Sequence, residues 1–111
     1  MQAREEPVEV AVIIVNYRSA ELTLRALSSL AEERTQPSLA LSVVVVENAS
    51  GDEARLREGI AEKYADFARL LVSPTNGGFG AGNNLGVRTL LSEGSKARYF
   101  HFLNPDTMVR E

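Results

Sequence analysis

The sequence predicts an α/β fold with a parallel sheet of about four strands and helices on both faces. Residues 8–15 and 39–46 are near-continuous apolar runs rich in β-branched side chains, which suit strands that are buried on both sides. Shorter runs at 69–73 and 99–103 predict two more strands. Between the runs, the apolar period changes to that of helices. This alternation favours right-handed crossovers and a parallel sheet.

The first predicted helix lies between the two long strands. Ser19 can cap its N-terminus. It should end near Thr35 and Pro37, because the residue before a proline disfavours the helical conformation. Its apolar positions share one stripe, with Leu30 beside them: Ala20, Leu24, Leu27 and Ala31.

The second predicted helix begins at Ser50 and Glu53, which have the spacing of a capping box. Apolar side chains then repeat every four residues, at Leu56, Ile60 and Tyr64. This spacing predicts an amphipathic helix that packs against the sheet.

The third predicted helix follows the glycine-rich residues 76–82. Gly94 should end it, because glycine adopts the left-handed conformation that closes many helices. Its packing positions are Asn83, Val87, Leu90 and Leu91.

The composition fits a single globular domain over residues 1–111, with 44% hydrophobic and 24% charged residues. No cysteine is present, so a disulfide framework, a thiolate metal cluster and a cysteine nucleophile are excluded. Twelve Lys and Arg against fifteen Asp and Glu disfavour a protein that binds nucleic acid, which needs a clustered basic surface.

The sequence shows no transmembrane segment and no export signal. Its longest apolar run, 10–15, is far shorter than the about 20 residues of a spanning helix, and residues 1–7 are polar and acidic. The chain ends at Glu111, shortly after the last predicted strand, so we expect part of a longer polypeptide. We therefore expect a cytoplasmic protein, or one that associates with a membrane through sequence that this chain lacks.

Polar turns follow all four predicted strands, at residues 15–19, 47–52, 76–84 and 104–107. The carboxyl ends of parallel strands meet at one edge of the sheet, where open α/β folds bind ligands. Amides, hydroxyls and glycines that allow close backbone approach suit a ligand rich in hydroxyl and carbonyl groups, such as a nucleotide or a sugar. Ordinary turn chemistry is the alternative for any single turn. Four coincident turns favour a site.

Asp106 is the strongest single candidate for a metal ligand. It lies on an Asn-Pro-Asp turn after an aromatic strand, where its carboxylate can bind Mg²⁺ while substrate phosphates and water fill the other positions. The alternative is an Asx turn, in which Asp106 bonds the backbone near Met108. The chemistry of these residues leaves both interpretations open.

Several familiar motifs are missing. Residues 78–83 break the G-x-G-x-x-G pattern at Asn83 and follow the third strand rather than the first, which disfavours a dinucleotide site. No P-loop and no G-x-S-x-G elbow occur. His101 lies inside the last predicted strand, so we expect a packed or edge-facing histidine rather than a base. A receiver-type domain would need clustered acids after the first strand, and residues 15–17 offer none.

Four motifs together resemble a known family. Residues 12–17, 45–50, 76–86 and 103–107, read in order, are similar to the N-terminal, donor-binding half of family 2 glycosyltransferases. The resemblance spans residues 8–109 and implies the GT-A fold, a Rossmann-like half-domain that binds a nucleotide sugar. The Asn-Pro-Asp-Thr motif most resembles rhamnosyltransferase-like members, which build bacterial surface polysaccharides.

The resemblance also implies roles for single residues. Residues 15–17 and Glu47 would hold the nucleoside base, and residues 76–84 would line the nucleotide pocket. Asp106 would bind the divalent cation, Mg²⁺ or Mn²⁺. The substrate-binding residues implied in this way are Val15, Asn16, Tyr17, Glu47, Asn48, Asn76, Gly77, Phe79, Asn83 and Asn104. The sequence departs from the family pattern at Asn104 and Glu47, where the family usually has Asp.

The implied activity is the transfer of a sugar, with inversion, from a nucleotide diphosphate sugar to a saccharide or lipid-linked acceptor. Family members supply the catalytic base and the acceptor site from sequence beyond the metal-binding turn, so no catalytic residue is assigned here and the chain alone could be inactive. The alternative is a non-enzymatic α/β module that binds a nucleotide or self-associates. Such a module would form a homodimer through the exposed last strand of the sheet.

Overall fold

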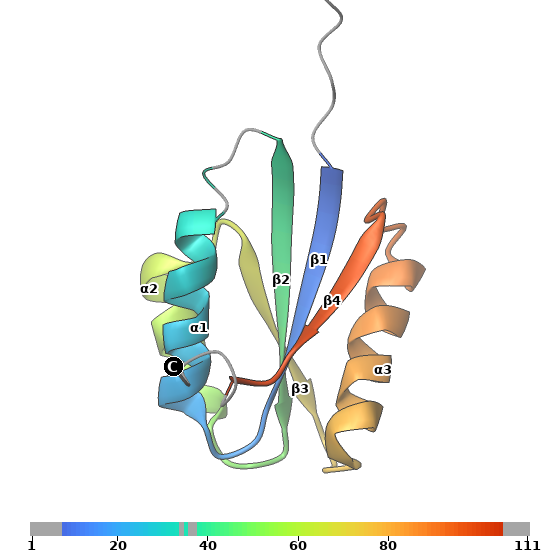
Figure 1. Cartoon of the computed structure of the whole chain (residues 1–111). Coiled ribbons are helices and arrows are strands. Elements are labelled where there is room, and N and C mark those ends of the chain that lie inside the picture. The colour runs from blue at the N-terminus through green and yellow to red at the C-terminus, as the bar shows by residue number, and fades with distance from the viewer. Residues whose placement is uncertain (1–7, 34, 36–37, 106–111) are drawn as a thin grey trace, which may run out of the picture.

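The computed structural model describes residues 8–33, 35 and 38–105. Strands and helices alternate along the chain, as the sequence predicts (Figure 1). The elements are β1 (Val8–Asn16), α1 (Ala20–Glu33), β2 (Leu39–Asn48), α2 (Glu53–Lys63), β3 (Ala68–Ser73), α3 (Gly78–Ser92) and β4 (Tyr99–Leu103). The predicted α/β class and the four predicted strands are confirmed.

The four strands form one parallel sheet in the order β3-β2-β1-β4. The central strands β1 and β2 are buried over residues 11–16 and 43–48, because helices cover both of their faces. From β1 the chain moves outward to β2 and β3 and then returns to the other side of β1. The strand order therefore reverses beside β1, which is where open α/β sheets form a ligand crevice at their carboxyl edge.

Two apolar cores lie on opposite faces of the sheet, with α1 and α2 on one face and α3 on the other (Figure 1). Successive strand residues alternate between these cores. The core under α1 and α2 includes Val12, Ile14, Leu27, Val45 and Leu56. The core under α3 includes Ile13, Val15, Val46 and Leu90. Helix α3 lies close to β1 because Gly82 and Gly86 face Val15 and Ile13.

The predicted capping box of the second helix is wrong. Helix α2 begins at Glu53, and Asp52 holds the N-cap position without a side-chain capping bond. The hydroxyl of Ser50 instead donates to the carboxylate of Glu47, at 2.9 Å from Oε1. A capping oxygen accepts a backbone N–H of its helix, but the oxygen of Ser50 accepts the N–H of Arg18 at 2.9 Å instead.

Helix α3 also differs in part from its prediction. It begins at Gly78, inside the glycine-rich stretch rather than after it. Leu91 is exposed rather than packed, whereas Leu90 and Asn83 are buried. Gly94 follows the helix with φ +80°, so the predicted stop is confirmed.

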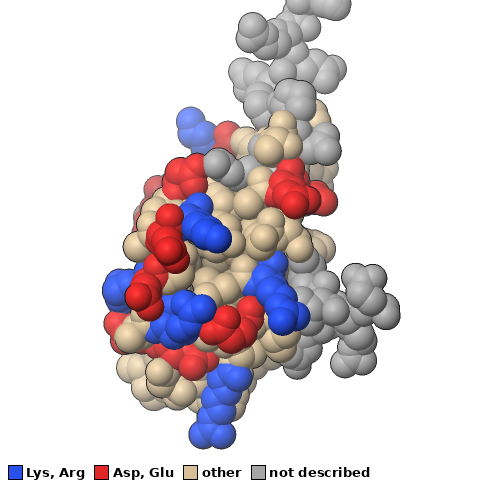
Figure 2. Space-filling view, turned by 90° about the vertical axis from the view of Figure 1, so that its left-hand side faces the viewer, with Lys and Arg blue, Asp and Glu red and all other residues tan. Residues whose placement is uncertain are grey.

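The outer surface of α1 and α2 carries charges of both signs (Figure 2). Arg55 pairs with Glu21 across the two helices, and Arg57 pairs with Glu53 one turn away. This face therefore offers no clustered basic surface of the kind that nucleic acid requires. Helices α1, α2 and α3 are each too short or too polar to cross a membrane. His101 is exposed on β4, in register with Val12, as predicted for an edge-facing side chain.

Candidate functional site

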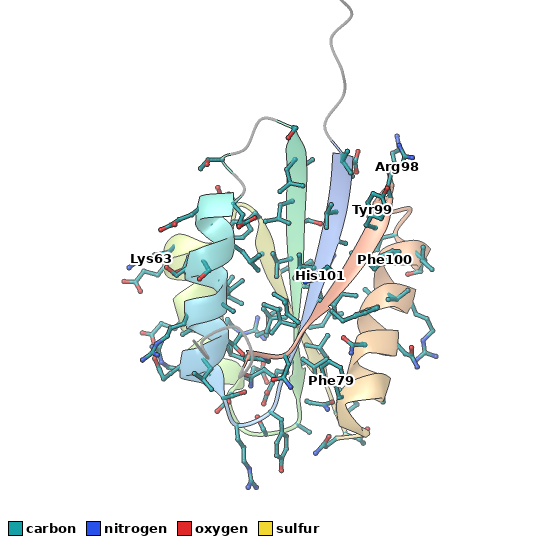
Figure 3. The ribbon with its side chains drawn as sticks, viewed as in Figure 1. Lys63, Phe79, Arg98, Tyr99, Phe100 and His101 are labelled. Carbon is teal, nitrogen blue, oxygen red and sulfur yellow. The ribbon has the colours of Figure 1, made fainter. Side chains whose placement is uncertain are left out.

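A cavity of about 280 Å³ lies at the carboxyl edge of the sheet. All four polar turns predicted from the sequence contribute to it, because the parallel strands end side by side beside the reversal of strand order. Figure 3 shows Phe79 at this edge, near the start of α3. The lining residues are Val15, Tyr17, Ser19, Asn48, Asn76, Gly78, Phe79, Asn104 and Pro105.

The implied binding residues divide into two groups. Six of them line the cavity: Val15, Tyr17, Asn48, Asn76, Phe79 and Asn104. Four others, Asn16, Glu47, Gly77 and Asn83, are not part of the lining. The metal-binding candidate Asp106 lies outside the described residues.

Three lining residues lie within the predicted polar turns but were not among the binding residues named from the sequence. Ser19 is the last residue of the first turn and was also predicted to cap the first helix. Gly78 lines the cavity with φ +94°, a conformation that favours glycine. Pro105 is buried beside Asn104. The sequence indicated these three residues only through their positions within the polar turns.

Asn48 joins the second turn to the third. Its side chain is only 2% exposed. Its Nδ2 donates to Asn76 Oδ1 at 2.9 Å and to the carbonyl oxygen of Gly78 at 3.1 Å. Its Oδ1 is buried and has no hydrogen-bond partner within the described structure. An unpaired buried acceptor is costly, and Asn48 is one of the lining residues, so a ligand that donates to this oxygen would relieve the cost.

Asn76 shapes the start of α3. Its Oδ1 accepts a hydrogen bond from the backbone N–H of Gly78 at 2.9 Å, in addition to the one from Asn48. The two bonds fix the turn that leads into the helix. Because Gly78 is both the first residue of α3 and part of the lining, the N-terminus of this helix borders the cavity. Free backbone N–H groups at a helix N-terminus favour an anion such as a phosphate.

Asn83 lies in the first half of α3 and is 7% exposed. Its Oδ1 is also buried without a partner among the residues the structure describes. Asn83 does not line the cavity. Its implied contact with the nucleotide stays a prediction.

A buried polar network lies beside the cavity. We call it the Glu47 network, and its members are Asn16, Thr23, Glu47, Ser50 and Asp52. Glu47 is 1% exposed, and its carboxylate accepts from Asn16 Nδ2 at 2.9 Å, from the backbone N–H of Ser50 at 2.8 Å and from that of Asp52 at 2.9 Å. The Ser50 hydroxyl adds a further bond. Burial works to raise the pKa of Glu47, but the hydrogen bonds from Asn16, Ser50 and Asp52 outweigh it and hold the pKa below its ordinary value.

Asn16 is the second member of the network and is fully buried. Its Nδ2 also donates to Asp52 Oδ2 at 2.9 Å. Its Oδ1 accepts from the hydroxyl of Thr23 at 2.7 Å and from that of Ser19 at 3.4 Å. Both hydrogens and the oxygen of the Asn16 amide are therefore bonded within the protein.

The turns after β1 and β2 are joined by a backbone contact. The N–H of Arg18 donates to Ser50 Oγ at 2.9 Å. Arg18 and Ala49 both adopt positive φ, at 54° and 58°, which is uncommon for residues other than glycine. The guanidinium of Arg18 lies 5.1 Å from the ring centre of Tyr17, one of the lining residues. Each turn is thus held in an unusual conformation next to the cavity.

The described part of the lining supplies neutral oxygen ligands, from asparagine, serine and tyrosine side chains. Within residues 8–105 as described, no group of three or more His, Asp or Glu side chains could hold a metal ion. Mg²⁺ usually takes one or two protein carboxylates and completes its shell with water and phosphate oxygens. The described lining includes no carboxylate, so a metal site with Asp106 as its acid stays a prediction.

Three larger hollows lie elsewhere on the described part of the molecule. One, of about 660 Å³, is an open depression over the charged surface of α2. Another, of about 510 Å³, lies between α1 and β4 and is lined mainly by apolar side chains. The third, of about 300 Å³, lies beside the start of β3 and Leu90. None of them brings together the polar turns at the carboxyl edge. The smaller cavity is therefore the better candidate site.

Comparison with known proteins agrees with this geometry. A search of curated proteins found no match to the chain. The model of Glycosyl transferase family 2 matches residues 11–111. That match includes the sheet and every turn that lines the cavity. The chain therefore belongs to glycosyl transferase family 2.

Proposed function

We propose that this chain binds the nucleotide diphosphate sugar of a glycosyltransferase, in the cavity at the carboxyl edge of the sheet. Family membership supports glycosyltransferase activity in general. The single observation that carries the assignment to this cavity is the unpaired Oδ1 of Asn48, a buried acceptor at a site bounded by all four turns.

The lining suits a nucleoside base. Tyr17 and Phe79 are both large, partly exposed aromatic side chains in the lining, on which a planar ring can stack. Asn48 Oδ1 can accept a hydrogen bond from a ring N–H of the base. Uracil, thymine and guanine carry such a donor, whereas cytosine has an acceptor at the equivalent ring nitrogen. The site should therefore favour the first three bases.

The diphosphate would lie toward the start of α3 and the turn after β4. The N–H of Gly78 is bonded to Asn76, and the backbone N–H groups of the next residues in the first turn of α3 offer hydrogen bonds to phosphate oxygens. We propose that Asp106 and Asn104 hold a divalent cation, Mg²⁺ or Mn²⁺. When bound, the cation would neutralise charge on the departing diphosphate.

We propose an inverting reaction. The acceptor oxygen forms a bond to the anomeric carbon while the bond from that carbon to the diphosphate breaks, and the acceptor proton passes to a base. We assign no base in this chain, because the family supplies it from sequence beyond the turn at Asp106. The rhamnosyltransferase-like assignment, the saccharide or lipid-linked acceptor, and the cytoplasmic or membrane-associated location stay predictions.

Nucleotide binding can be tested by thermal unfolding with UDP, dTDP, GDP and CDP, each with and without Mn²⁺. We expect a higher melting temperature with at least one nucleotide, and a further rise when Mn²⁺ is present. Asp106→Ala should abolish the Mn²⁺-dependent part. Glu62→Ala, at an exposed position on α2, is the matched control and should keep it. Equal Mn²⁺-dependent shifts of the melting temperature in both variants would contradict the role of Asp106 as a metal ligand. If no nucleotide raises the melting temperature of the original protein, the proposed function is wrong.

A second candidate function, self-association, is favoured by the exposed aromatic side chains of β4. Tyr99 is 59% and Phe102 is 46% exposed, and β4 is the last strand at its side of the described sheet. Figure 3 shows Tyr99 and His101 along this strand. Sedimentation of the chain distinguishes the two functions. A tight dimer that shows no thermal shift with nucleotides would favour the self-associating module.

A further inference from the structure

We propose that Glu47 is a positioning residue, which acts through the Glu47 network rather than by touching the nucleotide, and that Thr23 and Asp52 are its necessary partners. The inference rests on the proposed nucleotide site. It replaces the contact between Glu47 and the base that the family resemblance implies. It also gives a role to two residues, Thr23 and Asp52, that no sequence motif singled out.

The first step is the saturation of Glu47. Four donor groups already bond its two carboxylate oxygens: the amide of Asn16, the backbone N–H groups of Ser50 and Asp52, and the Ser50 hydroxyl. The side chain is buried and is not part of the cavity lining. A nucleotide could reach Glu47 only by breaking these bonds.

The second step is the alternation of strand β2. Successive side chains on a strand point to opposite faces. Val43 and Val45 pack in the core under α1 and α2, so Glu47 continues that face. Asn48 is the next residue and lines the cavity. In this proposal Glu47 therefore holds the turns together, whereas the adjacent Asn48 contacts the ligand.

The third step is the orientation of Asn16. Glu47 and Asp52 each present an acceptor oxygen to Asn16 Nδ2, both at 2.9 Å. The Thr23 hydroxyl supplies the complementary donor, at 2.7 Å from Asn16 Oδ1. Thr23 is fully buried in α1. Its hydroxyl therefore fixes which way the Asn16 amide points and keeps both amide hydrogens directed at the two carboxylates.

The fourth step connects the network to the cavity wall. The Ser50 hydroxyl that donates to Glu47 also accepts the N–H of Arg18, so the turns after β1 and β2 are joined. Tyr17 precedes Arg18, and Asn48 precedes Ala49, and both preceding residues line the cavity. The network thereby sets the separation of Tyr17 and Asn48, two of the side chains that we propose contact the base.

The test compares three variants by calorimetric titration with UDP, dTDP and GDP in the presence of Mn²⁺. Thr23→Val keeps the shape of the side chain but removes the donor, and should weaken binding about tenfold, which corresponds to one lost hydrogen bond. Thr23→Ser keeps the hydroxyl and should stay within about twofold of the original affinity. Ile60→Val is the control: it removes a buried methyl group from α2, away from the cavity, and should lower the melting temperature without changing affinity.

Unchanged affinity in Thr23→Val would overturn the proposal, and so would an equal loss in Ile60→Val. If Thr23→Val does not fold, Asp52→Ala gives the same comparison, because Asp52 is only partly buried and makes no side-chain cap to α2. In that variant, too, weaker binding supports the proposal and unchanged binding overturns it.

A second measurement separates failure of this inference from failure of the proposed function. The side-chain amide resonances of Asn16 and Asn48 can be followed by NMR without any nucleotide. In Thr23→Val both should shift relative to Ile60→Val. If both resonances shift but no nucleotide binds the original protein, the Glu47 network is supported and the proposed nucleotide site is contradicted. If Asn16 shifts and Asn48 does not, the network does not reach the cavity wall and the inference fails.

Discussion

Asn16 and Glu47 occupy partnered positions on the adjacent parallel strands β1 and β2, and Asn16 Nδ2 donates to Glu47 Oε1 across 2.9 Å. Both side chains are at most 1% exposed. Asn16 is the last residue of β1 and Glu47 the last but one of β2, and each directly follows an apolar run, 10–15 or 43–46. A polar pair in this place is tolerated because every donor and acceptor that it buries is bonded, to Thr23, Ser50 and Asp52 among others.

Glu47→Gln should destabilise the protein, and the effect should depend on pH. An amide nitrogen at this position would face backbone donors, so we expect a loss of about 3 kcal/mol in the free energy of unfolding near pH 7. The folded-state pKa of Glu47 is lowered, so its charge adds stability that is complete above its ordinary value of 4.5 and is lost as the pH falls through the folded-state pKa. Urea unfolding at about pH 7 and about pH 3 measures both effects.

The stability of Glu47→Gln should therefore fall less steeply with acid than that of the original protein. Glu21→Gln is the matched control. The pKa of Glu21 is also lowered, through its hydrogen bond to Arg55, but that pair is exposed. Its replacement should leave most of the acid dependence in place. Parallel pH profiles for Glu47→Gln and the original protein would contradict the assignment.

The fold could be predicted because its signals are local. The β-branched runs of β1 and β2 have no polar side chain over residues 10–15 and 43–46, so burial on both faces follows from composition. The edge strands gave weaker signals, yet the bounds of β4 were correct and β3 was one residue short, because it begins at Ala68. The convergence of the four turns followed from the parallel arrangement alone.

The different roles of Glu47 and Asn48 could not be predicted in the same way. Glu47 and Asn48 are adjacent polar residues at a strand end, and only the packing of α1 decides which of them faces the helix. Thr23 shares the apolar stripe of α1 with Ala20 and Leu27, but no sequence motif indicates that its hydroxyl bonds the amide of Asn16. The capping box at Ser50 failed for a similar reason, since the Ser50 hydroxyl accepts from Arg18 and donates to Glu47, which belong to other elements of the chain.

Gly86→Ala should loosen the contact between α3 and β1. An added Cβ would lie 2.9 Å from Ile13 Cγ2, closer than side chains tolerate, and Ile13 is fully buried. We expect a loss of about 1 to 2 kcal/mol, after the gain of about 1 kcal/mol in helix propensity. Gly80→Ala, in the same helix with nothing within 4 Å of the added Cβ, should instead be stabilising. Equal thermal shifts for both variants would show that the close approach does not matter.

Ala49→Gly should stabilise the turn after β2. Ala49 has φ 58°, a conformation that costs a residue with a Cβ about 1 kcal/mol or more. Glycine removes that strain, and the greater freedom of the unfolded chain offsets part of the gain, so we expect about 0.5 kcal/mol of net stabilisation. Ala54→Gly, in the exposed face of α2, should lose about 1 kcal/mol. Thermal unfolding measures both effects. A lower melting temperature in both variants would contradict the expected relief of strain at position 49.

Asn48→Ala should remove the preference for bases that carry a ring N–H. In the original protein, Asn48 Oδ1 is the buried acceptor that such a donor would satisfy. We expect UDP to bind at least about tenfold more tightly than CDP, because cytosine leaves that oxygen unpaired. In Asn48→Ala both nucleotides should bind weakly and about equally, since the acceptor is gone and the bonds that hold Asn76 and Gly78 are lost. Asn84→Ala, at an exposed position of α3 outside the lining, should keep the ratio of the two dissociation constants. A ratio that survives in Asn48→Ala would place base recognition on other residues of the cavity.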